Sequence, residues 1–167
     1  MAQSLEPIPV SQDDLLHQVF DQSTAGFQVI DSNWRYLFVN ETVAKQGKSE
    51  VQRLVGHTMM EMYPGIDKTP LFGYLKKCMD QKTSIRMDNE FIYPDGTRGW
   101  FQLFIHSWSD GIMIFSIDIT DRKLAEAEMS EKIEELEKSA KSSEDKKGIS
   151  ELKATLLKIR KPQIEVI

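Results

Sequence analysis

The chain has 167 residues, 40% of them apolar and 28% charged, which fits one domain with a core and a modest extension. Its net charge of −5, without a basic stripe, argues against nucleic acid as a partner. No apolar run reaches the roughly 18 residues that a membrane span needs, and the single cysteine, Cys78, suits a reducing compartment, so we expect a cytoplasmic protein without membrane contact.

The N-terminal segment predicts a loose leader and one short helix. Residues 1–11 hold two prolines and little periodicity, so we expect a folded domain over 12–121. From Asp13 to Phe20, acidic residues come first, where the helix dipole favours them, and the apolar residues form one stripe.

The next segment predicts a β-hairpin and a series of helices. Strand-like runs at 27–30 and 36–39 flank a polar turn. Asn40 is placed to cap a helix over 41–46. Short helical segments follow, and then a proline that suits the first turn of a helix opens a longer one over 71–81.

Three strands close the predicted domain. Residues 85–93 form the first, and the apolar runs 100–108 and 112–117 form the others. The turn sequences Pro94-Asp95-Gly96 and Ser109-Asp110-Gly111 join them, and turns this short connect only antiparallel neighbours. Two strands, several short helices and three strands therefore predict an α+β fold with an antiparallel sheet.

A charged helix follows the last strand and carries a weak heptad pattern. Its apolar residues repeat at 4-3-4 spacing, about two heptads of a coiled coil, at Met129, Ile133, Leu136 and Ala140. We expect a signalling or linker helix over 122–141, a break over 142–148, and a tail helix and chain end over 149–167. The apolar stripe of the tail is out of heptad phase with the first, so one continuous coiled coil is not expected.

Several of these features resemble the PAS (Per-Arnt-Sim) sensor domain. The resemblance covers about residues 13–123 and rests on the order of elements and on Tyr36-Leu37-Phe38-Val39-Asn40, Gly56, Asp95-Gly96-Thr97 and Trp100. Its most specific part is the ending Asp118-Ile119-Thr120-Asp121-Arg122-Lys123, which matches the C-terminal, PAC-type signature of the family. The resemblance implies a five-stranded antiparallel sheet with short helices over one face, an N-terminal helix and a C-terminal helical extension. It also implies a module that binds a ligand or cofactor, or dimerises, and regulates an attached output.

The closing triplet Asp118-Ile119-Thr120 is expected to act as a signal relay. An aspartate at a strand end can accept hydrogen bonds from the N–H groups that open the next helix, and Thr120 can cap that helix. The triplet would then fix the angle at which the helix leaves the sheet. The alternative is a plain helix cap without a signalling role.

Strand alternation, aligned to the family, assigns one face of the sheet to a pocket. The residues that the resemblance implies for the pocket are Gln28, Ile30, Met59, Met62, Phe91, Phe101, Leu103, Ile105, Ile114 and Ser116. Methionines adapt to irregular shapes and would suit a small apolar ligand. The alternative is a core filled by its own side chains.

The opposite face of the sheet is also apolar, which the solvated face of an antiparallel sheet would not be. The N-terminal helix, a second subunit, or both must therefore cover it. We expect both, in a parallel homodimer that brings the two C-terminal helices together. The residues expected at this dimer face are Leu16, Phe20, Trp100, Phe104, Trp108, Met113, Phe115 and Ile117.

The residues at the family's cofactor sites disfavour flavin and haem. Flavin-binding members of the light-oxygen-voltage subgroup carry Gly-Xaa-Asn-Cys, whose cysteine bonds the flavin, and this chain has Gly56-His57-Thr58-Met59. Haem-binding members use a histidine on the long helix, and residues 71–81 contain none. The three histidines show no metal spacing, and no histidine follows His106 to serve as a kinase phosphoacceptor. We expect no enzyme activity in this chain.

Three functions remain open at this level. We favour a sensory and dimerisation module of a bacterial-type two-component signal transduction system, which relays a pocket or interface change through the C-terminal helix to a partner protein. One alternative is a photoreceptor or redox sensor that binds a ligand or a cofactor such as flavin or haem. Another is an interaction scaffold that does not sense. The colour of the purified protein would separate a flavin or haem sensor from the others.

Overall fold

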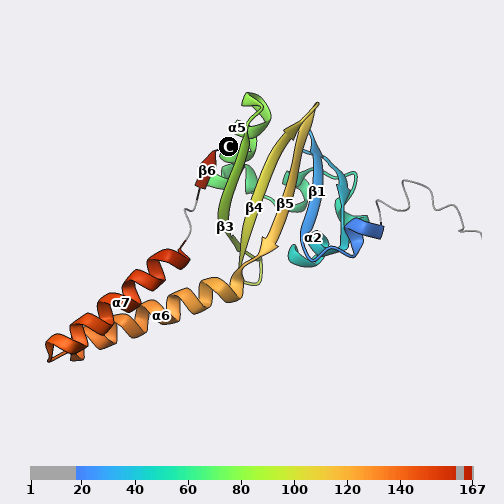
Figure 1. Ribbon diagram of the computed structural model, residues 1–167. Coiled ribbons are helices and arrows are strands. Elements are labelled where there is room, and N and C mark those ends of the chain that lie inside the picture. Colours follow the sequence, from blue (N-terminus) through green and yellow to red (C-terminus); the bar gives the residue numbers. More distant parts are fainter. Residues whose placement is uncertain (1–17, 161–163, 167) are drawn as a thin grey trace, which may run out of the picture.

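The computed structural model describes residues 18–160 and 164–166 (Figure 1). Its antiparallel sheet has the strand order β2-β1-β5-β4-β3-β6. The expected hairpin and the expected three-stranded meander are both present. Their strands are β1 (Gly26–Asp31), β2 (Tyr36–Val39), β3 (Ser84–Ile92), β4 (Arg98–Trp108) and β5 (Gly111–Asp118). The predicted α+β fold with a five-stranded antiparallel sheet is confirmed.

The sequence does not predict the sixth strand, β6 (Ile164–Val166). It pairs antiparallel with the outer edge of β3, with Ile85 opposite Val166 and Met87 opposite Ile164. Three residues are too few to show strand alternation. Only the pairing partner, far away in the sequence, identifies this segment as a strand.

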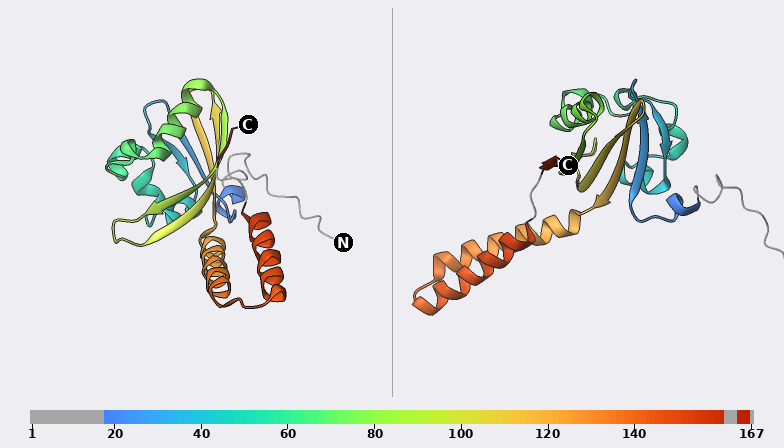
Figure 2. Two further views of the ribbon diagram at one scale, coloured as in Figure 1. Left: turned by 90° about the vertical axis from the view of Figure 1, so that its left-hand side faces the viewer. Right: turned by 45° about the horizontal axis from the view of Figure 1, so that its top comes forward.

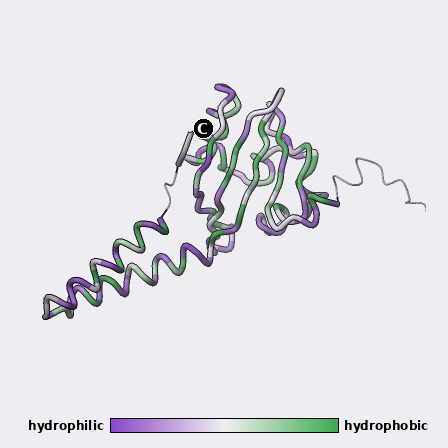
Figure 3. The backbone as a smooth tube through the Cα atoms, viewed as in Figure 1, coloured by the Kyte–Doolittle hydropathy of each residue, from purple (hydrophilic) through white to green (hydrophobic). Residues whose placement is uncertain are grey.

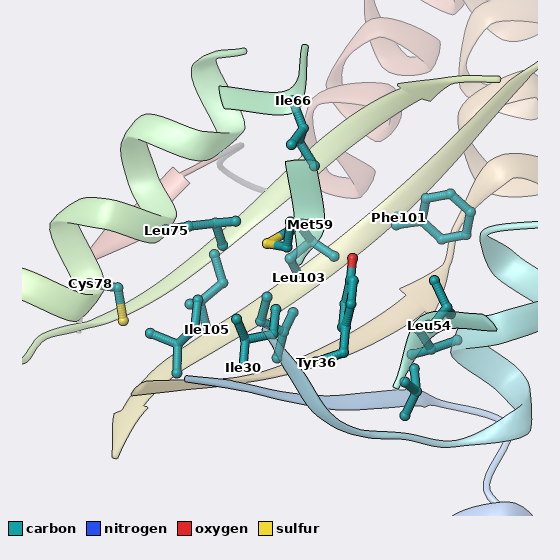
Figure 4. Packing of buried hydrophobic residues seen from close by; sticks show 14 of the residues in the cluster. Ile30, Tyr36, Leu54, Met59, Ile66, Leu75, Cys78, Phe101, Leu103 and Ile105 are labelled. Atoms are coloured by element: carbon teal, nitrogen blue, oxygen red, sulfur yellow. The ribbon is translucent and has the colours of Figure 1, made fainter. Parts of the chain in front are cut away.

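A layer of helices covers one face of the sheet (Figure 2). These helices are α2 (Glu41–Gln46), α3 (Val51–Leu54), α4 (Met59–Met62), the 3-10 helix η1 (Ile66–Lys68) and α5 (Pro70–Gln81). The main core lies between this layer and the sheet (Figure 4), and Ile30, Leu75 and Ile105 are fully buried in it. We call this side of the sheet the inner face and the opposite side the outer face.

Side-chain caps fix where the short helices begin. Asn40 caps α2 as predicted, with its Oδ1 accepting from the Val43 N–H at 3.1 Å. Thr58 and Glu61 form a capping box at α4, and Thr69 caps α5 ahead of its first residue, Pro70. Helices of four to six residues are not stable alone, so these caps and the packing on the sheet hold them in place.

The N-terminal helix contributes residues 18–21 to the described structure, and the expected start at Asp13, together with Leu16, lies outside the described residues. Phe20 stacks on Phe27 of β1, with 4.4 Å between the ring centroids. Phe27 alternates with the inward-facing Gln28, so this contact covers part of the outer face.

The C-terminal extension is a hairpin of two antiparallel helices (Figures 1 and 2). Helix α6 (Thr120–Ser139) leaves the sheet after β5, and α7 (Ser143–Ile159) returns beside it. The expected break over 142–148 is helical for most of its length. Ser142 and Asp145 form a capping box, and α7 starts at Ser143. The tail helix therefore includes the lysine pair and the glycine that we assigned to the break.

Figure 3 shows that apolar residues gather along the sheet, whereas apolar and hydrophilic residues alternate along α6 and α7. None of the described helices is both long enough and apolar enough to cross a membrane. The described residues also contain no group of three or more His, Cys, Asp or Glu side chains that could hold a metal ion.

Candidate functional site

A cavity of about 90 Å³ lies on the inner face, between the sheet and the layer of helices. Strands β1 to β5 form one side of it, and α2 to α5 form the other. Most of the expected pocket residues line this cavity: Gln28, Met59, Phe91, Phe101, Leu103, Ile114 and Ser116.

Three expected pocket residues do not line the cavity. Ile30 and Ile105 are fully buried in the core, and Met62 packs against the core from α4. On both strands the lining residue is two positions away, at Gln28 on β1 and at Leu103 on β4. Alternation predicts the face of a strand residue, but the cavity occupies one end of that face and side chains fill the other end.

Several polar residues in the cavity wall are not predicted from the sequence: Tyr36, Gln46, Tyr63 and Asn89. Asn89 lies on β3 two positions before Phe91, so strict alternation would have found it. Gln46 comes from the last turn of α2 and Tyr63 from the residue after α4. No short sequence pattern places such residues at the sheet.

The hydroxyl of Tyr36 is directed into the cavity, in the space between Met59 and Phe101 (Figure 4). Tyr36 is only 3% exposed, and its hydroxyl has no hydrogen-bond partner among the described residues. The side-chain amides of Gln28 and Asn89 also line the cavity without a partner in the described part of the chain. These polar atoms border the cavity space and are not sealed in the core, so they are available to bind polar atoms of a small molecule there.

Burial raises the pKa of the Tyr36 hydroxyl far above its ordinary range, and the nearby Tyr63 raises it further. Burial likewise raises the pKa of Tyr63, with Tyr93 as a second cause. Both phenols therefore stay neutral at physiological pH and are available as hydrogen-bond donors. The residues that line the cavity carry no formal charge, so a charged ligand would be buried there without a counter-ion.

A polar pair at one end of the cavity joins α2 to β5. The Ser116 hydroxyl donates to Gln46 Oε1, and Gln46 Nε2 donates to the Ser116 carbonyl at 3.3 Å. A side chain at Gly26 would collide with this pair, because an added Cβ would lie 2.3 Å from Ser116 Oγ. Ser116 is two residues before Asp118, so the cavity wall and the exit of α6 belong to the same strand.

Helix α6 leaves the sheet through three hydrogen bonds. Asp118 Oδ1 accepts from the Thr120 N–H at 2.9 Å, as predicted for an aspartate at a strand end. The Ile119 N–H donates to the Trp100 carbonyl at 2.8 Å. Thr120 does not cap α6 as expected, because it is the first residue of the helix and its hydroxyl accepts from the Trp100 N–H at 3.0 Å. The exit is therefore tied to β4, and its relay role stays a prediction.

Replacing Asp118 by alanine is expected to leave the sheet folded and to loosen the start of α6. The change removes one exposed hydrogen bond, which is worth about 1 kcal/mol at a helix start, and the two bonds to Trp100 remain. Amide hydrogen exchange in the first turn of α6 should rise about fivefold, while exchange in β4 and β5 stays unchanged. Asp121→Ala is the matched control in the same turn. Equal exchange in the two variants would show that Asp118 does not hold the helix.

A buried carboxylate on the outer face also holds the first turns of α6. The Asp88 side chain, on β3, is only 1% exposed, and its Oδ2 lies 2.8 Å from Lys123 Nζ and 3.2 Å from Arg122 Nη2. Gln102 Nε2 donates to its other oxygen at 3.0 Å. Arg122 also pairs with the buried Glu126 at 2.7 Å. We call these five residues the Asp88 cluster.

Asp88 keeps its charge in this cluster. Burial acts to raise the pKa of its carboxyl group, but hydrogen bonds from Lys123 and Gln102, together with the charge of Lys123, outweigh that effect and lower the pKa below its ordinary value. The sequence gives no signal for the cluster, because an aspartate within a strand is typical of a solvated position. Only the register that places Asp88 opposite Gln102 brings the group under α6.

The rest of the outer face is apolar and partly open. Trp108 is 38% and Ile117 43% exposed. The other expected dimer-face residues on the sheet are half-buried: Trp100, Phe104, Met113 and Phe115. The Phe20–Phe27 stack covers one part of this face, and Lys123 lies 5.1 Å from the ring centroid of Trp100 on another. The role of these residues in a dimer stays a prediction.

A family model described as the PAS fold matches residues 20–124. No sequence in a comparison with curated proteins matches this chain. Among solved structures, the chain is similar to the VqmA dimer of Vibrio cholerae in the absence of its target DNA, with 19% sequence identity and a TM-score of 0.56 over 68% of this chain and 53% of that chain. The chain thus spans about half the length of VqmA.

Two further solved structures are similar. One is a domain of the sensory box sensor histidine kinase/response regulator from Geobacter sulfurreducens, with 18% identity and a TM-score of 0.53 over 64% of this chain and 94% of that chain. The other is an RNA-binding light-oxygen-voltage receptor, with 12% identity and a TM-score of 0.55 over 71% of this chain and 38% of that chain. At these identities the likeness shows the fold alone.

Proposed function

Because the chain belongs to the PAS-fold family, we propose that it is a sensor domain that binds a small neutral ligand in its cavity and relays binding to helix α6. The observation that carries this proposal is the hydroxyl of Tyr36, which borders an uncharged cavity and makes no hydrogen bond to another described residue. The module is regulatory rather than catalytic.

The chemistry of the cavity wall limits the ligand. Two phenols offer hydrogen-bond donors, and the amides of Gln28 and Asn89 offer both donors and acceptors. Apolar side chains such as Phe101 and Leu103 form the rest of the wall. These groups fit an uncharged molecule with a small apolar body and one or two polar atoms.

The volume of the cavity sets the size of that molecule. Ligand pockets commonly measure about 300–1,000 Å³, and this cavity measures about 90 Å³. It therefore fits a molecule of a few heavy atoms, and a larger one only if flexible neighbours such as Met59 move. A flavin or a haem would require extensive repacking, so this volume favours a small ligand over the cofactor-based alternative.

A physical connection to α6 supports the relay. A ligand that contacts Ser116 or Gln46 acts on β5 two residues before Asp118. Phe101, another wall residue, lies directly opposite Asp118 in the pairing of β4 with β5. Small displacements of these two strands therefore reach the hydrogen bonds that set the start of α6.

Replacing Tyr36 by phenylalanine tests the proposed ligand site. In ligand-free protein we expect the free energy of unfolding to rise by less than about 1 kcal/mol, because the change removes a poorly solvated hydroxyl that makes no hydrogen bond to another described residue. Urea denaturation measures this effect, and Tyr74→Phe on α5 is the control. Mass spectrometry of small molecules released from the purified protein should find one with the wild type and less of it with Tyr36→Phe. A less stable variant that releases the same molecules would contradict the proposal.

We also propose that the domain works as a parallel homodimer through its outer face and acts on a signalling partner, as in two-component systems. The partial exposure of Trp108 and Ile117 supports the dimer, and light scattering across the micromolar range tests it. A monomer at all these concentrations would exclude the dimer.

The nature of the output stays open. The similar proteins include a domain of a sensor histidine kinase/response regulator, VqmA, which has a target DNA, and an RNA-binding receptor. The expectation that nucleic acid is excluded is therefore not supported for a larger protein or complex that contains this domain. The proposal for the present chain is confined to the sensor and its relay helix.

A further inference from the structure

We propose that helix α7 covers a self-association surface on α6, and that the partner of this surface is the same surface on a second copy of the chain. The surface consists of Met129, Ile133 and Leu136 of α6 together with Ala140, the residue that follows the helix, and we call it the α6 stripe. The inference rests on the proposed function, because it assumes that α6 is the output helix. It adds that the output is blocked while α7 is in place.

The α6 stripe faces α7 in the structure. Ile133 is buried against Ile149 and Leu156 of α7, and the other members of the stripe pack around this contact. The same residues repeat at the 4-3-4 spacing of a coiled-coil seam, with Ile133 and Ala140 at a positions and Met129 and Leu136 at d positions. One seam cannot face two helices at once. The hairpin and an α6–α6 coiled coil are therefore mutually exclusive.

Charges beside the stripe identify the second occupant. In this heptad register Lys132 is at a g position and Glu137 at the following e position, the two positions that form ion pairs between parallel helices. In the hairpin Glu137 instead pairs with Lys153 of α7 at 2.6 Å, and Lys132 pairs with Glu135 of its own helix at 3.1 Å. Lys153 thus takes the place that Lys132 of a second copy would take. This complementarity favours a parallel α6–α6 pair.

The contacts that hold α7 are few and exposed. The ion pair of Lys153 with Glu137 is about half exposed on both sides, and exposed pairs of this kind contribute little. Arg160 Nη2 donates to Ser130 Oγ at 2.9 Å on the surface. The buried part of the interface centres on Ile133, Ile149 and Leu156. A cover held this weakly can be released by a modest change at the base of α6.

The sheet provides a second attachment for the tail beyond α7. Strand β6 pairs with Ile85 to Met87 of β3, and the next residue of β3 is Asp88, which holds the first turns of α6. Strand β3 therefore contacts both the first turns of the output helix and the strand that follows its cover. A displacement of β3 would act on both contacts.

Cross-linking between copies of the full chain tests the inference. Ala140→Cys places a thiol in the α6 stripe, and Glu134→Cys places one on the opposite, exposed side of α6; the native Cys78 is buried. Ile149→Asp combined with Leu156→Asp puts charges into the contact that holds α7. This double change should raise oxidative cross-linking through Ala140→Cys at least tenfold and leave cross-linking through Glu134→Cys unchanged. Leu157→Asp is the matched control, because Leu157 is 69% exposed on the same helix.

Charge reversal checks the partner and its direction. In the opened variant, Lys132→Glu should reduce cross-linking by opposing Glu137 of the other copy, and adding Glu137→Lys should restore it. The fluorescence of the sheet tryptophans would show whether the double change disturbs folding. If it does, Lys153→Glu is a milder variant that opens the hairpin by removing the ion pair with Glu137. Unchanged cross-linking in both opened variants would overturn the inference. If cross-linking stayed unchanged but a small molecule was still released and the outer-face dimer still formed, the proposed function would stand without the inference. If neither the released molecule nor the outer-face dimer was found but the opened variants still cross-linked through α6, the proposed function would fail and the α7 cover would remain.

Discussion

Replacing Asn40 by alanine is expected to lower the free energy of unfolding by about 3–5 kcal/mol. Asn40 is fully buried, and its side chain uses its whole hydrogen-bonding capacity. Oδ1 accepts from the N–H groups of Phe27 at 2.9 Å and Val43 at 3.1 Å. Nδ2 donates to the carbonyl groups of Phe20 at 2.7 Å and Ala25 at 3.0 Å. Alanine would remove the hydrogen bonds of the Phe27 and Val43 N–H groups and of the Ala25 carbonyl to this side chain, whereas the Phe20 carbonyl would keep its bond from the Ser23 N–H at 3.2 Å.

Urea unfolding followed by tryptophan fluorescence measures this loss. Thr42→Ala is the matched control, because the Thr42 hydroxyl donates to the Ser23 carbonyl at 2.7 Å and so ties the same N-terminal segment by one bond. That control should cost about 1 kcal/mol. Asn40→Ala should also free the Phe20 stack from the outer face, which hydrogen exchange of residues 18–25 would detect. Equal losses in the two variants would contradict the central role of Asn40.

Asn40 also shows which part of the structure follows from the sequence. Its cap on α2 is local, since the acceptor and the Val43 N–H are three residues apart, and the pattern before the helix predicts it. Its other bonds reach residues 13 to 20 positions earlier. Such contacts depend on how the hairpin folds back, and no short pattern encodes them.

The candidate site likewise contains residues that local patterns predict and residues whose placement depends on tertiary packing. Alternation placed Gln28, Phe101 and Ser116 on the inner face, where they line the cavity. The extent of the cavity along the strands depends on how far the helical layer fills the space, so Ile30 and Ile105 were assigned to the pocket although they belong to the core. Periodicity therefore predicts which face a residue occupies, and tertiary packing decides whether the space beside it is filled.

The exit of α6 was predicted in position but not in its contacts. Asp118 and its bond to the helix follow from a local strand-end pattern. The bonds of Ile119 and Thr120 to Trp100 are cross-strand contacts, and so is the pairing of Asp88 with Gln102 under α6. The residues with the strongest hold on the output helix are thus the ones that the sequence did not reveal.

Replacing Asp88 by alanine is expected to detach the first turns of α6 and to lower the free energy of unfolding by about 2–3 kcal/mol. Removing one partner of a fully buried ion pair costs about 3–5 kcal/mol. The cost is smaller here because the side chains of Lys123 and Arg122 are 14% and 30% exposed and can turn to water. Hydrogen exchange should rise throughout the first two turns of α6, beyond the single turn affected by Asp118→Ala.

Glu90→Gln is the matched control for this change. Glu90 lies on the same strand and the same face as Asp88 and pairs with Arg98 at 2.8 Å, but the Arg98 side chain is 63% exposed. Such a pair contributes less than about 1 kcal/mol, so exchange in α6 should not change. If Glu90→Gln loosened α6 as much as Asp88→Ala, a general loss of negative charge on the sheet would explain both results.

The pH dependence of the start of α6 separates the Asp88 charge from the shape of its side chain. The pKa of Asp88 in the folded protein is lower than its ordinary value of about 3.9. Its contribution to stability is therefore fully present above the ordinary value and is lost as the pH falls through the folded value.

In the wild type, exchange in the first turns of α6 should rise in that acidic range. In Asp88→Asn, which keeps the shape without the charge, exchange should be high already at neutral pH and change little on acidification. A wild-type acid response retained in Asp88→Asn would assign the effect to another carboxylate. Asp88→Asn also tests the cover formed by α7. If β3 links the Asp88 cluster to the tail, this change should raise cross-linking through Ala140→Cys.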